Sequence, residues 1–354
     1  MTYRFATQVR RWTRAGVALA TVIAAGAVFA QGATKPAVIC FGDPALSASS
    51  AITTSIPIQA GYYKANGLDV RIQPSASGSE CALAVSSGHA FATAAGMTAL
   101  LVAANKDPNL VIVAASYRYS WGVAVPEASP IKTIADLKGK AIGVQSLSSA
   151  SYLFGKAIVN EGGIDADKDV QWLNVGLGAT AANALQTNRV AAYATYNGVV
   201  DVVGSLLNTK MRWLPSPITL MQGNYGWLVR RSELKNNPEM VAGLLRGAFQ
   251  GIVYANANPE EGLKLHLKQY PEQSNPATQK TNAAVLASRA EEQIMTDESG
   301  QIGYVSIERL QQTADFYVKN GLLANKVDVS KLADFSAIKS ANDFDRQKIV
   351  ASLK

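Results

Sequence analysis

The 354-residue sequence has very few of the side chains that carry enzymatic chemistry, with only two histidines and two cysteines. Neither His89 nor His266 has a neighbour at the spacing of a metal site or a catalytic triad. The motifs HExxH, GxSxG, CxxC and the P-loop are also missing. These absences argue against an enzyme, and we expect no catalytic residue and no metal site.

A dinucleotide-binding site is disfavoured by a missing acidic residue. Gly176–Ala181 matches GxGxxA and follows a predicted strand. A nucleotide fold would place an acidic residue about 20 positions later, at the end of the next strand. That strand instead ends in Thr195-Tyr196-Asn197. We therefore interpret the glycines as the turn that starts a helix, and we expect no cofactor.

Basic residues are not clustered, although the formal charge is +7 and the pI about 9.2. Residues 1–14 hold four arginines and no acidic residue, and an apolar stretch of small residues follows up to Ala30. This order is typical of a secretory signal peptide, and the apolar stretch is shorter than the roughly 20 residues of a membrane span. Removal of residues 1–30 lowers the charge to +3. We expect a periplasmic protein with no nucleic-acid partner.

The remaining chain is long enough for about two domains. Short β-rich runs alternate with helical patterns up to about residue 230, which is typical of α/β proteins with mostly parallel sheets flanked by helices, and the part from Glu233 onward is mostly helical. The strands are expected at Val38–Phe41, Leu68–Gln73, Ala90–Ala94, Leu110–Ala115, Trp121–Val125, Ala141–Val144, Val170–Val175, Ala191–Ala194, Arg212–Leu214 and Gly226–Val229. Helical patterns between them lie at Ser55–Ala65, Glu80–Ser86, Met97–Asn105, Ser149–Asn160 and Ala179–Asn188.

The chain is expected to form two lobes. The strand at residues 121–125, followed by a segment with two prolines, would leave the first unit, and residues 223–229 would return to it. This predicts one lobe from residues 35–120 and 228–354, and a second lobe from residues 125–222. A ligand would bind between the lobes, beyond the carboxyl ends of the strands.

Small polar residues follow several predicted strands and precede helices. Backbone N–H groups at such ends bind anionic groups, although serine and threonine are also ordinary helix caps. If these ends converge on one cleft, the candidate ligand-binding residues are Ser47, Ser49, Ser77, Gly78, Ser79, Thr98, Ser146, Ser148 and Ser149.

Aromatic and amide side chains lie near the two places where the chain is predicted to pass from one lobe to the other. Arg118 follows a strand and stands beside Tyr117, so it could hold an acidic ligand while aromatic rings stack on an apolar body. A surface arginine packed on a tyrosine is the equally weighted alternative. Tyr196 and Asn197 end another strand, and Asn224 stands at the return crossing. These five residues complete the candidate site.

The two cysteines allow one disulfide in an exported chain. Cys40 ends a predicted strand and Cys81 starts a predicted helix. The sequence leaves open whether they form a bridge or stay as two buried thiols.

Two segments carry a family resemblance. Residues 59–70, QAGYYKANGLDV, resemble the G-Y-F-x-x-x-G-L-x-V signature of the nitrate/sulfonate/taurine-type solute-binding proteins, the NMT1/THI5-like family. Residues 130–144, PIKTIADLKGKAIGV, resemble the segment that opens the second lobe in that family. The resemblance implies a type II periplasmic-binding fold, with the ligand held at the strand ends named above. The segment His89-Ala90-Phe91-Ala92 departs from the best-known members, because relatives commonly carry an acidic residue before the Phe.

The resemblance also implies a function. We expect the substrate-binding component of an ABC importer, a monomer that docks transiently on a permease in the inner membrane. The expected ligand is a small organic anion, a sulfonate or a carboxylate, and aromatic members of both classes are included. The alternatives are a pyrimidine or another neutral solute, and a sensor subunit on the same fold.

Overall fold

Two separate mixed sheets organise the chain in the computed structural model, which describes residues 34–118, 120–147, 149–216, 218, 221–276 and 278–353. The expected signal peptide at residues 1–30 and the candidate residue Ser148 lie outside the described residues. Each sheet is flanked by helices, and the C-terminal part is helical, so the predicted two-sheet α/β fold is confirmed.

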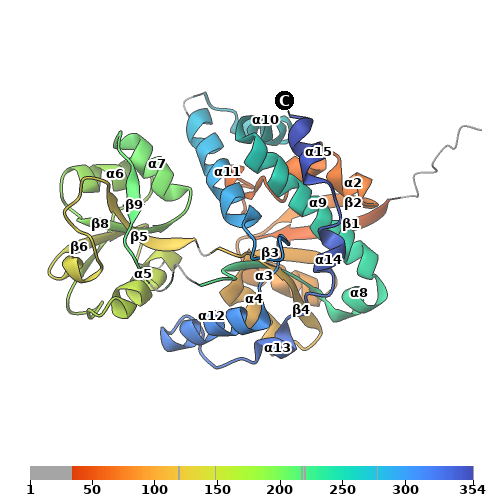
Figure 1. The fold of residues 1–354 in the computed structure, drawn as a ribbon, viewed down its shortest axis with the longest axis horizontal. Helices are drawn as coiled ribbons and strands as arrows, with labels where there is room; N and C mark the ends of the chain where they lie inside the picture. Colours follow the sequence, from red (N-terminus) through yellow and green to blue (C-terminus); the bar gives the residue numbers. More distant parts are fainter. Residues whose placement is uncertain are drawn as a thin grey trace, which may run out of the picture. The chain divides into compact units, whose positions relative to one another are not determined.

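The first sheet has the strand order β2-β1-β3-β10-β4. Figure 1 labels its strands β1, β2, β3 and β4. β1 is parallel to β2 and β3, whereas β10 is antiparallel to β3 and β4. All six residues of β4 are buried, as expected for a strand covered by helices on both faces. The first part of the chain, which forms four of the five strands of this sheet, contains β1 (Lys35–Phe41), η1 (Ala48–Ser50), α1 (Ser55–Gln59), α2 (Tyr62–Ala65), β2 (Leu68–Pro74), α3 (Gly78–Ser86), β3 (Ala92–Gly96), α4 (Met97–Lys106) and β4 (Leu110–Ala115).

The second sheet has the order β7-β6-β8-β5-β9, and β5 is its antiparallel strand. Each sheet therefore contains one antiparallel strand, and it is the strand whose chain has just arrived from the other sheet. The elements are β5 (Trp121–Pro126), η2 (Ala135–Leu137), β6 (Ala141–Val144), α5 (Ala150–Glu161), β7 (Gln171–Asn174), α6 (Ala179–Gln186), β8 (Ala192–Tyr196), α7 (Val199–Leu206) and β9 (Met211–Trp213).

The chain then returns to the first sheet and continues as helices. α9 packs one face of this sheet through a cluster of buried apolar side chains that includes Val113, Trp227 and Phe249. The elements are β10 (Tyr225–Arg230), α8 (Arg231–Asn236), α9 (Pro238–Ala257), α10 (Pro259–Gln269), η4 (Pro271–Gln273), α11 (Gln279–Ile294), α12 (Ile307–Lys319), α13 (Val329–Leu332), α14 (Ile338–Ala341) and α15 (Arg346–Ala351). Within the described residues, no helix combines the length and apolar character that a membrane crossing requires.

One expected helix, at residues 55–65, is divided in two. Gly61 adopts a φ of 76°, in the left-handed region, and this separates α1 from α2. The glycines of α9 allow the same segment to lie against that helix. A Cβ on Gly247 would stand 2.4 Å from the ring of buried Tyr63, and one on Gly251 would stand 2.4 Å from the Ile52 carbonyl oxygen.

The sheets are joined by two crossovers, within residues 116–120 and 214–224, and their described residues Ser116, Gly223 and Asn224 lie side by side. Ser116 N donates to the Tyr225 carbonyl, and Gly223 N donates to the Ser116 carbonyl. The Ser116 hydroxyl also donates to Asn224 Oδ1 over 2.8 Å. These bonds hold the two chain passages in a fixed register at the boundary between the sheets.

C-terminal helices contact the second sheet's helices on two sides. Gly198, at the start of α7, lies against Val285 of α11, where an added Cβ would be 3.5 Å from a Val285 methyl. On the other side, Phe154 of α5 and Tyr317 of α12 have ring centroids 5.9 Å apart. α11 and α12 therefore reach beyond the first sheet.

Cys40 and Cys81 are joined in a disulfide, which the sequence had left open. Both are buried, and the bridge fixes the end of β1 to the first turn of α3. Gly42 lies against the same turn, because a Cβ there would be 2.6 Å from Gly78 N.

Candidate ligand-binding cavity

A cavity of about 510 Å³ lies where the two crossovers meet strand ends from both sheets. We call it the inter-sheet cavity. The parallel strands β1, β3 and β8 end at the cavity, and the antiparallel strands β5 and β10 begin at it. The cavity therefore lies at the edge of each sheet where the carboxyl ends of the parallel strands are found. Ligands of open α/β sheets bind at this edge. Its lining residues are Phe41, Gly42, Asp43, Pro44, Ser47, Ser49, Gly96, Ser120, Trp121, Tyr196, Asn224, Tyr225 and Arg289.

Aromatic rings form the apolar part of the wall. Trp121 stacks on Phe154 with centroids 4.7 Å apart and lies 5.1 Å from the Tyr196 ring at a tilt of 60°. Tyr225 enters from β10, and its hydroxyl donates to the Ala94 carbonyl. Burial raises the pKa of both tyrosines, so they are neutral hydrogen-bonding side chains at physiological pH. Such rings suit a planar apolar surface on a ligand.

Another part of the wall is the loop after β1, and polar side chains within this loop hold it in shape. The Asp43 carboxylate accepts from Ser47 N over 2.8 Å and from Ser47 Oγ over 2.7 Å. Ser47 Oγ and Ser49 Oγ are 2.9 Å apart. Asp43 therefore positions both candidate serines and also brings a negative charge to the cavity wall.

A buried histidine supports this loop from behind. Gln273 Nε2 donates to the carbonyls of Ala45 and Leu46, which turns its Oε1 toward His266 Nε2 at 3.1 Å. His266 therefore carries its proton on Nε2 and accepts at Nδ1 from the Ser55 hydroxyl, 2.8 Å away. Burial lowers the pKa of His266, so the ring is neutral at pH 7. It supports the structure and does not line the cavity.

Arg289 of α11 is the basic residue of the cavity wall. Its Nη1 lies 2.6 Å from Oε2 of Glu292, one turn later on the helix. The side chains are 14% and 0% exposed, so the pair is removed from solvent. The Arg289 guanidinium also lies over the Tyr225 ring, 5.6 Å from its centroid. Burial raises the pKa of Glu292, and the charge of Arg289 counteracts that shift.

Polar groups at the crossovers meet this ion pair. Asn224 Nδ2 donates to Ser120 Oγ, and both side chains are close enough to Glu292 to lower its pKa. Oε1 of Glu292 has no well-formed hydrogen bond to any described residue. A buried acceptor without a partner is costly, and such atoms mark places where another group completes the network.

The structure brings four of the sequence-predicted residues to the inter-sheet cavity: Ser47, Ser49, Tyr196 and Asn224. The other described candidates do not line it. Several of them instead form local hydrogen bonds at the start of a helix. Ser77 accepts from Glu80 N at the start of α3. Ser149 donates to the Ser146 carbonyl and shares a hydrogen bond with Ser151. The residues outside the cavity wall are Ser77, Gly78, Ser79, Thr98, Tyr117, Arg118, Ser146, Ser149 and Asn197.

Arg118 lies outside the cavity because it reaches the exposed face of α11. Its Nη1 is 3.4 Å from Oε1 of Glu291 and 3.6 Å from the sulfur of Met295. Arg118 therefore lies at the surface, and the contacts found for its guanidinium are with Glu291 and Met295. Asn197 contributes through its backbone, because its N–H donates to the Ser120 carbonyl and fixes the end of β8 to the first crossover.

Sequence reasoning missed Arg289 and Asp43. Asp43 directly follows the first strand, within the polar loop that supplied Ser47, and its position was the available signal. Arg289 gave no such signal, because Arg and Glu three residues apart on a helix are typical of a solvated face.

A second groove, also of about 510 Å³, runs between α10 and α11. Its lining, which includes Leu263, Leu267 and Ala287, has charged side chains at Glu260, Lys264 and Lys280. It lies away from the strand ends, and no buried charged residue is among its lining residues. The inter-sheet cavity is therefore the stronger candidate for a ligand.

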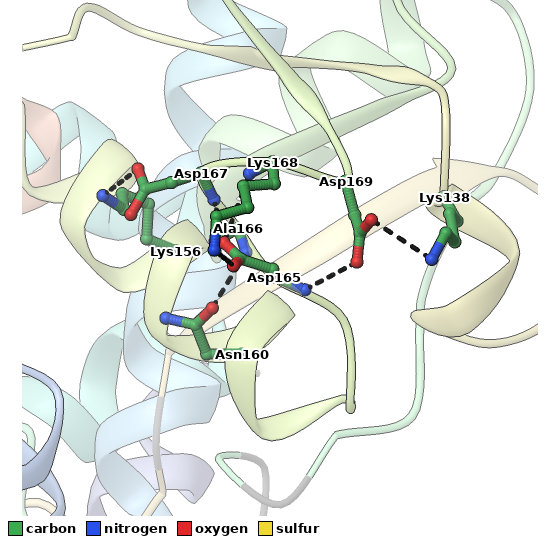
Figure 2. Close-up of polar contacts among 8 residues, drawn as sticks. All are labelled: Lys138, Lys156, Asn160, Asp165, Ala166, Asp167, Lys168 and Asp169. Carbon is green, nitrogen blue, oxygen red and sulfur yellow. Dashed lines mark hydrogen bonds and ion pairs between the residues drawn. The ribbon is translucent and has the colours of Figure 1, made fainter.

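Three aspartates between α5 and β7 resemble a cation site in sequence but are already paired (Figure 2). Asp165, Asp167 and Asp169 form ion pairs with Lys168, Lys156 and Lys138 respectively. Asp165 and Asp169 also accept backbone N–H groups of this turn. Among the described residues, no cluster of His, Cys, Asp or Glu could hold a metal ion. The cluster stabilises the turn.

Comparisons with known proteins agree with this architecture. The family model NMT1/THI5 like matches residues 55–262. A riboflavin-binding protein, RibY from Chloroflexus aurantiacus, is 26% identical over 77% of this chain and 77% of its own length. A putative aliphatic sulfonates-binding protein from Escherichia coli is 28% identical over 58% of this chain and 60% of its own length.

Solved structures share the fold. The periplasmic aliphatic sulphonate binding protein SsuA from Escherichia coli matches with a TM-score of 0.60 and 21% identity, over 85% of this chain and 92% of that chain. The desulfurization enzyme DSZB matches with a TM-score of 0.53 and 17% identity, over 86% and 98%. The fold therefore supports both binding proteins and an enzyme. With more than half of its length matched by the family model, the chain belongs to the NMT1/THI5-like family and has a periplasmic-binding-protein fold.

Proposed function

We propose that this chain is the periplasmic solute-binding component of an ABC importer. We further propose that it holds a small aromatic solute in the inter-sheet cavity. The two curated relatives are binding proteins, for riboflavin and, putatively, for aliphatic sulfonates. The single observation that carries the proposal is that Arg289 lines the same cavity as the aromatic pair Trp121 and Tyr196.

This wall composition suits a ligand with two parts. A planar body would lie against Trp121 and Tyr196, and an acceptor group would face the N–H donors of Arg289. The amide of Asn224 and the hydroxyls of Ser47 and Ser49 would bind further polar atoms. An aromatic sulfonate or carboxylate presents such acceptors, and so does an uncharged ring with carbonyl groups.

The same geometry supports binding over catalysis. Among the described residues both cysteines are in the disulfide, so no free thiol is present there. His266 is buried behind the β1 loop, and His89 is exposed and contacts Ser87 Oγ. Neither histidine lines the inter-sheet cavity. Among the described wall residues, Ser47 is a hydroxyl with an adjacent carboxylate, and Asp43 accepts its backbone N–H as well as its O–H, so this contact supports the loop after β1.

We also propose that the two sheets form the lobes of this binding protein, with residues 35–120 and 228–354 in one lobe and 125–222 in the other. Hinge motion would occur near residues 121–125 and 223–229. The crossovers found at residues 116–120 and 214–224 support this division, because few chain passages connect the sheets there. Closure would then be favoured by a ligand that contacts both sides of the cavity.

Binding can be tested by thermal unfolding of the chain from Gln31 onward with aromatic sulfonates, aromatic carboxylates, pyrimidines and riboflavin. A ligand at about 100 times its Kd adds about 2.7 kcal/mol of stability, which raises Tm by a few degrees. Tyr196→Ala should remove that shift, because it opens the aromatic wall. Leu267→Ala, in the groove between α10 and α11, is the control and should leave the shift intact. A shift lost in Leu267→Ala and kept in Tyr196→Ala would locate binding elsewhere.

A further inference from the structure

We infer that Glu292 sets the charge selectivity of the inter-sheet cavity, so that the site selects an uncharged planar solute over an anion of the same shape. This inference rests on the proposed function, since it concerns the ligand of that cavity. It begins with the positions of Arg289 and Glu292 on α11, three residues apart and joined by an ion pair of 2.6 Å.

The positive charge of Arg289 is compensated by the carboxylate of Glu292, a residue of the protein itself. Glu292 is fully buried, and Arg289 is 14% exposed, so neither partner can exchange the other for solvent or for a dissolved ion. Separating a buried pair leaves an uncompensated charge, which is strongly unfavourable. An arriving anion would therefore meet a guanidinium whose charge is already balanced.

The charges of the cavity do not favour an anion. Among the described residues of its wall, Arg289 is the basic member and Asp43 is the acidic one. With Glu292 paired to Arg289, the cavity wall and its buried neighbour together hold two carboxylates and one guanidinium. A sulfonate or carboxylate placed on Arg289 would lose its hydration and would gain little net attraction.

The hydrogen-bonding capacity of Arg289 nevertheless remains useful. Glu292 accepts one of the five N–H groups that a guanidinium offers. The side chain lines the cavity, so its other N–H groups can donate to carbonyl or ring-nitrogen acceptors of an uncharged ligand. Oε1 of Glu292 lacks a well-formed partner among the described residues, and it lies beside Ser120 and Asn224, which both line the cavity. A polar group of a ligand could be linked to this buried acceptor through those two side chains.

The test uses probes that differ in charge and hardly in shape. Nicotinamide and nicotinate form one pair, and benzamide and benzoate form the second. Affinities are measured at pH 7.5 by saturation-transfer NMR and calorimetry on wild type, Glu292→Gln and Glu291→Gln. Glu291 is the matched control, because it is adjacent on α11, loses the same charge and pairs with Arg118 outside the cavity.

We expect wild type and Glu291→Gln to bind the amides at least tenfold more tightly than the acids. Glu292→Gln should reverse or remove this ratio by a gain in acid affinity of at least tenfold. If Glu292→Gln unfolds, the double variant Arg289→Gln/Glu292→Gln removes the pair without leaving an unpaired charge, and it should bind amide and acid with similar affinity. A purely structural role for Glu292 would change both affinities equally and leave the ratio unchanged.

Two further results would overturn the inference, and they differ in what they say of the function. Tighter binding of the acids by wild type would reject the charge selectivity while leaving a ring-binding cavity in place. The absence of binding by both members of both pairs, together with no thermal shift in the wider screen, would reject the proposed function as well.

Discussion

Arg118 forms an ion pair with Glu291, with 3.4 Å between Nη1 and Oε1, on the exposed face of α11. The next residue of that helix, Glu292, forms the buried pair with Arg289. Two adjacent carboxylates on one helix thus meet two arginines in opposite environments. The side chains of Arg118 and Glu291 are 40% and 68% exposed, and exposed pairs of this kind contribute about 0–1 kcal/mol.

The two arginines should therefore respond differently to substitution. Arg118→Ala is expected to change ligand affinity by less than about twofold and the free energy of unfolding by less than 1 kcal/mol. Arg289→Lys should weaken binding at least tenfold, because an ammonium cannot reproduce the planar set of donors. The affinities of both variants are measured by calorimetry with a ring solute that stabilises the wild-type protein, and the free energy of unfolding is measured by urea denaturation. A large loss in Arg118→Ala with none in Arg289→Lys would move the site to the surface of α11.

Loss of the disulfide should destabilise the protein markedly. Cys40 and Cys81 are 41 residues apart, and closing a loop of that length in the unfolded chain corresponds to about 4 kcal/mol. The double variant Cys40→Ala/Cys81→Ala should therefore unfold at a lower urea concentration than wild type. Reducing agent should lower the stability of wild type and leave the double variant unchanged. Equal stability of the two proteins without reducing agent would contradict this expectation.

His266 should make stability depend on pH. Its pKa in the folded protein is lowered from 6.5, mainly by burial. The unfolded chain therefore takes up a proton first as pH falls, so the contribution is present above pH 6.5 and is lost as pH falls through the folded-state pKa. The groups that face the ring are Ser55, Gln273 and Tyr270, with the charges of Glu272 and Asp43 nearby.

The measurement is urea unfolding at several pH values between 7.5 and 5. His266→Gln should show a flatter loss of stability over this range than wild type, although it is less stable at pH 7.5. His89→Gln is the control, because His89 is exposed, and its profile should follow that of wild type. Parallel profiles for wild type and His266→Gln would assign the pH dependence to other groups.

The close contact of α9 with residues 52–66 predicts that one methyl group added at Gly251 strongly lowers the stability of the protein. In Gly251→Ala, the new Cβ would meet the Ile52 carbonyl oxygen at 2.4 Å and Pro57 at 2.8 Å. Backbone cannot yield as a side chain does, so we expect a loss of about 2–3 kcal/mol in the free energy of unfolding.

Gly262→Ala in α10 is the matched control for this substitution. There the nearest atom is the end of the Ile56 side chain, at 3.0 Å, which can move. Alanine also favours a helix over glycine by about 1 kcal/mol, so this variant should be close to neutral. Equal losses in Gly251→Ala and Gly262→Ala, by chemical denaturation, would show that close packing of α9 is not the cause.

Several elements of the fold follow from local sequence. The buried run of β4 and the helix that begins at Met97 are found where the apolar pattern predicts them. The division of the expected helix at residues 55–65 required one further fact, the left-handed conformation of Gly61. Glycine permits that conformation but does not demand it, so the pattern alone gave one continuous helix.

The candidate site was only partly accessible to the same reasoning. Ser47, Tyr196 and Asn224 follow or precede strands, and strand ends meet at one edge of a sheet, so their approach to a cavity could be expected. The same rule also selected Ser77 and Ser149, whose hydroxyl groups instead form local hydrogen bonds. A helix cap and a ligand contact use the same residue types, and local sequence does not distinguish them.

The sequence by itself determined the α/β class, the family resemblance and the strand ends from which a cavity could be built. These features depend on the period of apolar residues and on short motifs, which are local properties of the chain. Only the tertiary structure decided that Arg289 faces the cavity while Arg118 faces solvent, and that Glu292 is buried behind Arg289. The physical reason is that α11 lies about 170 residues beyond Arg118 in the chain, and the packing of distant segments decides which face of a helix is buried.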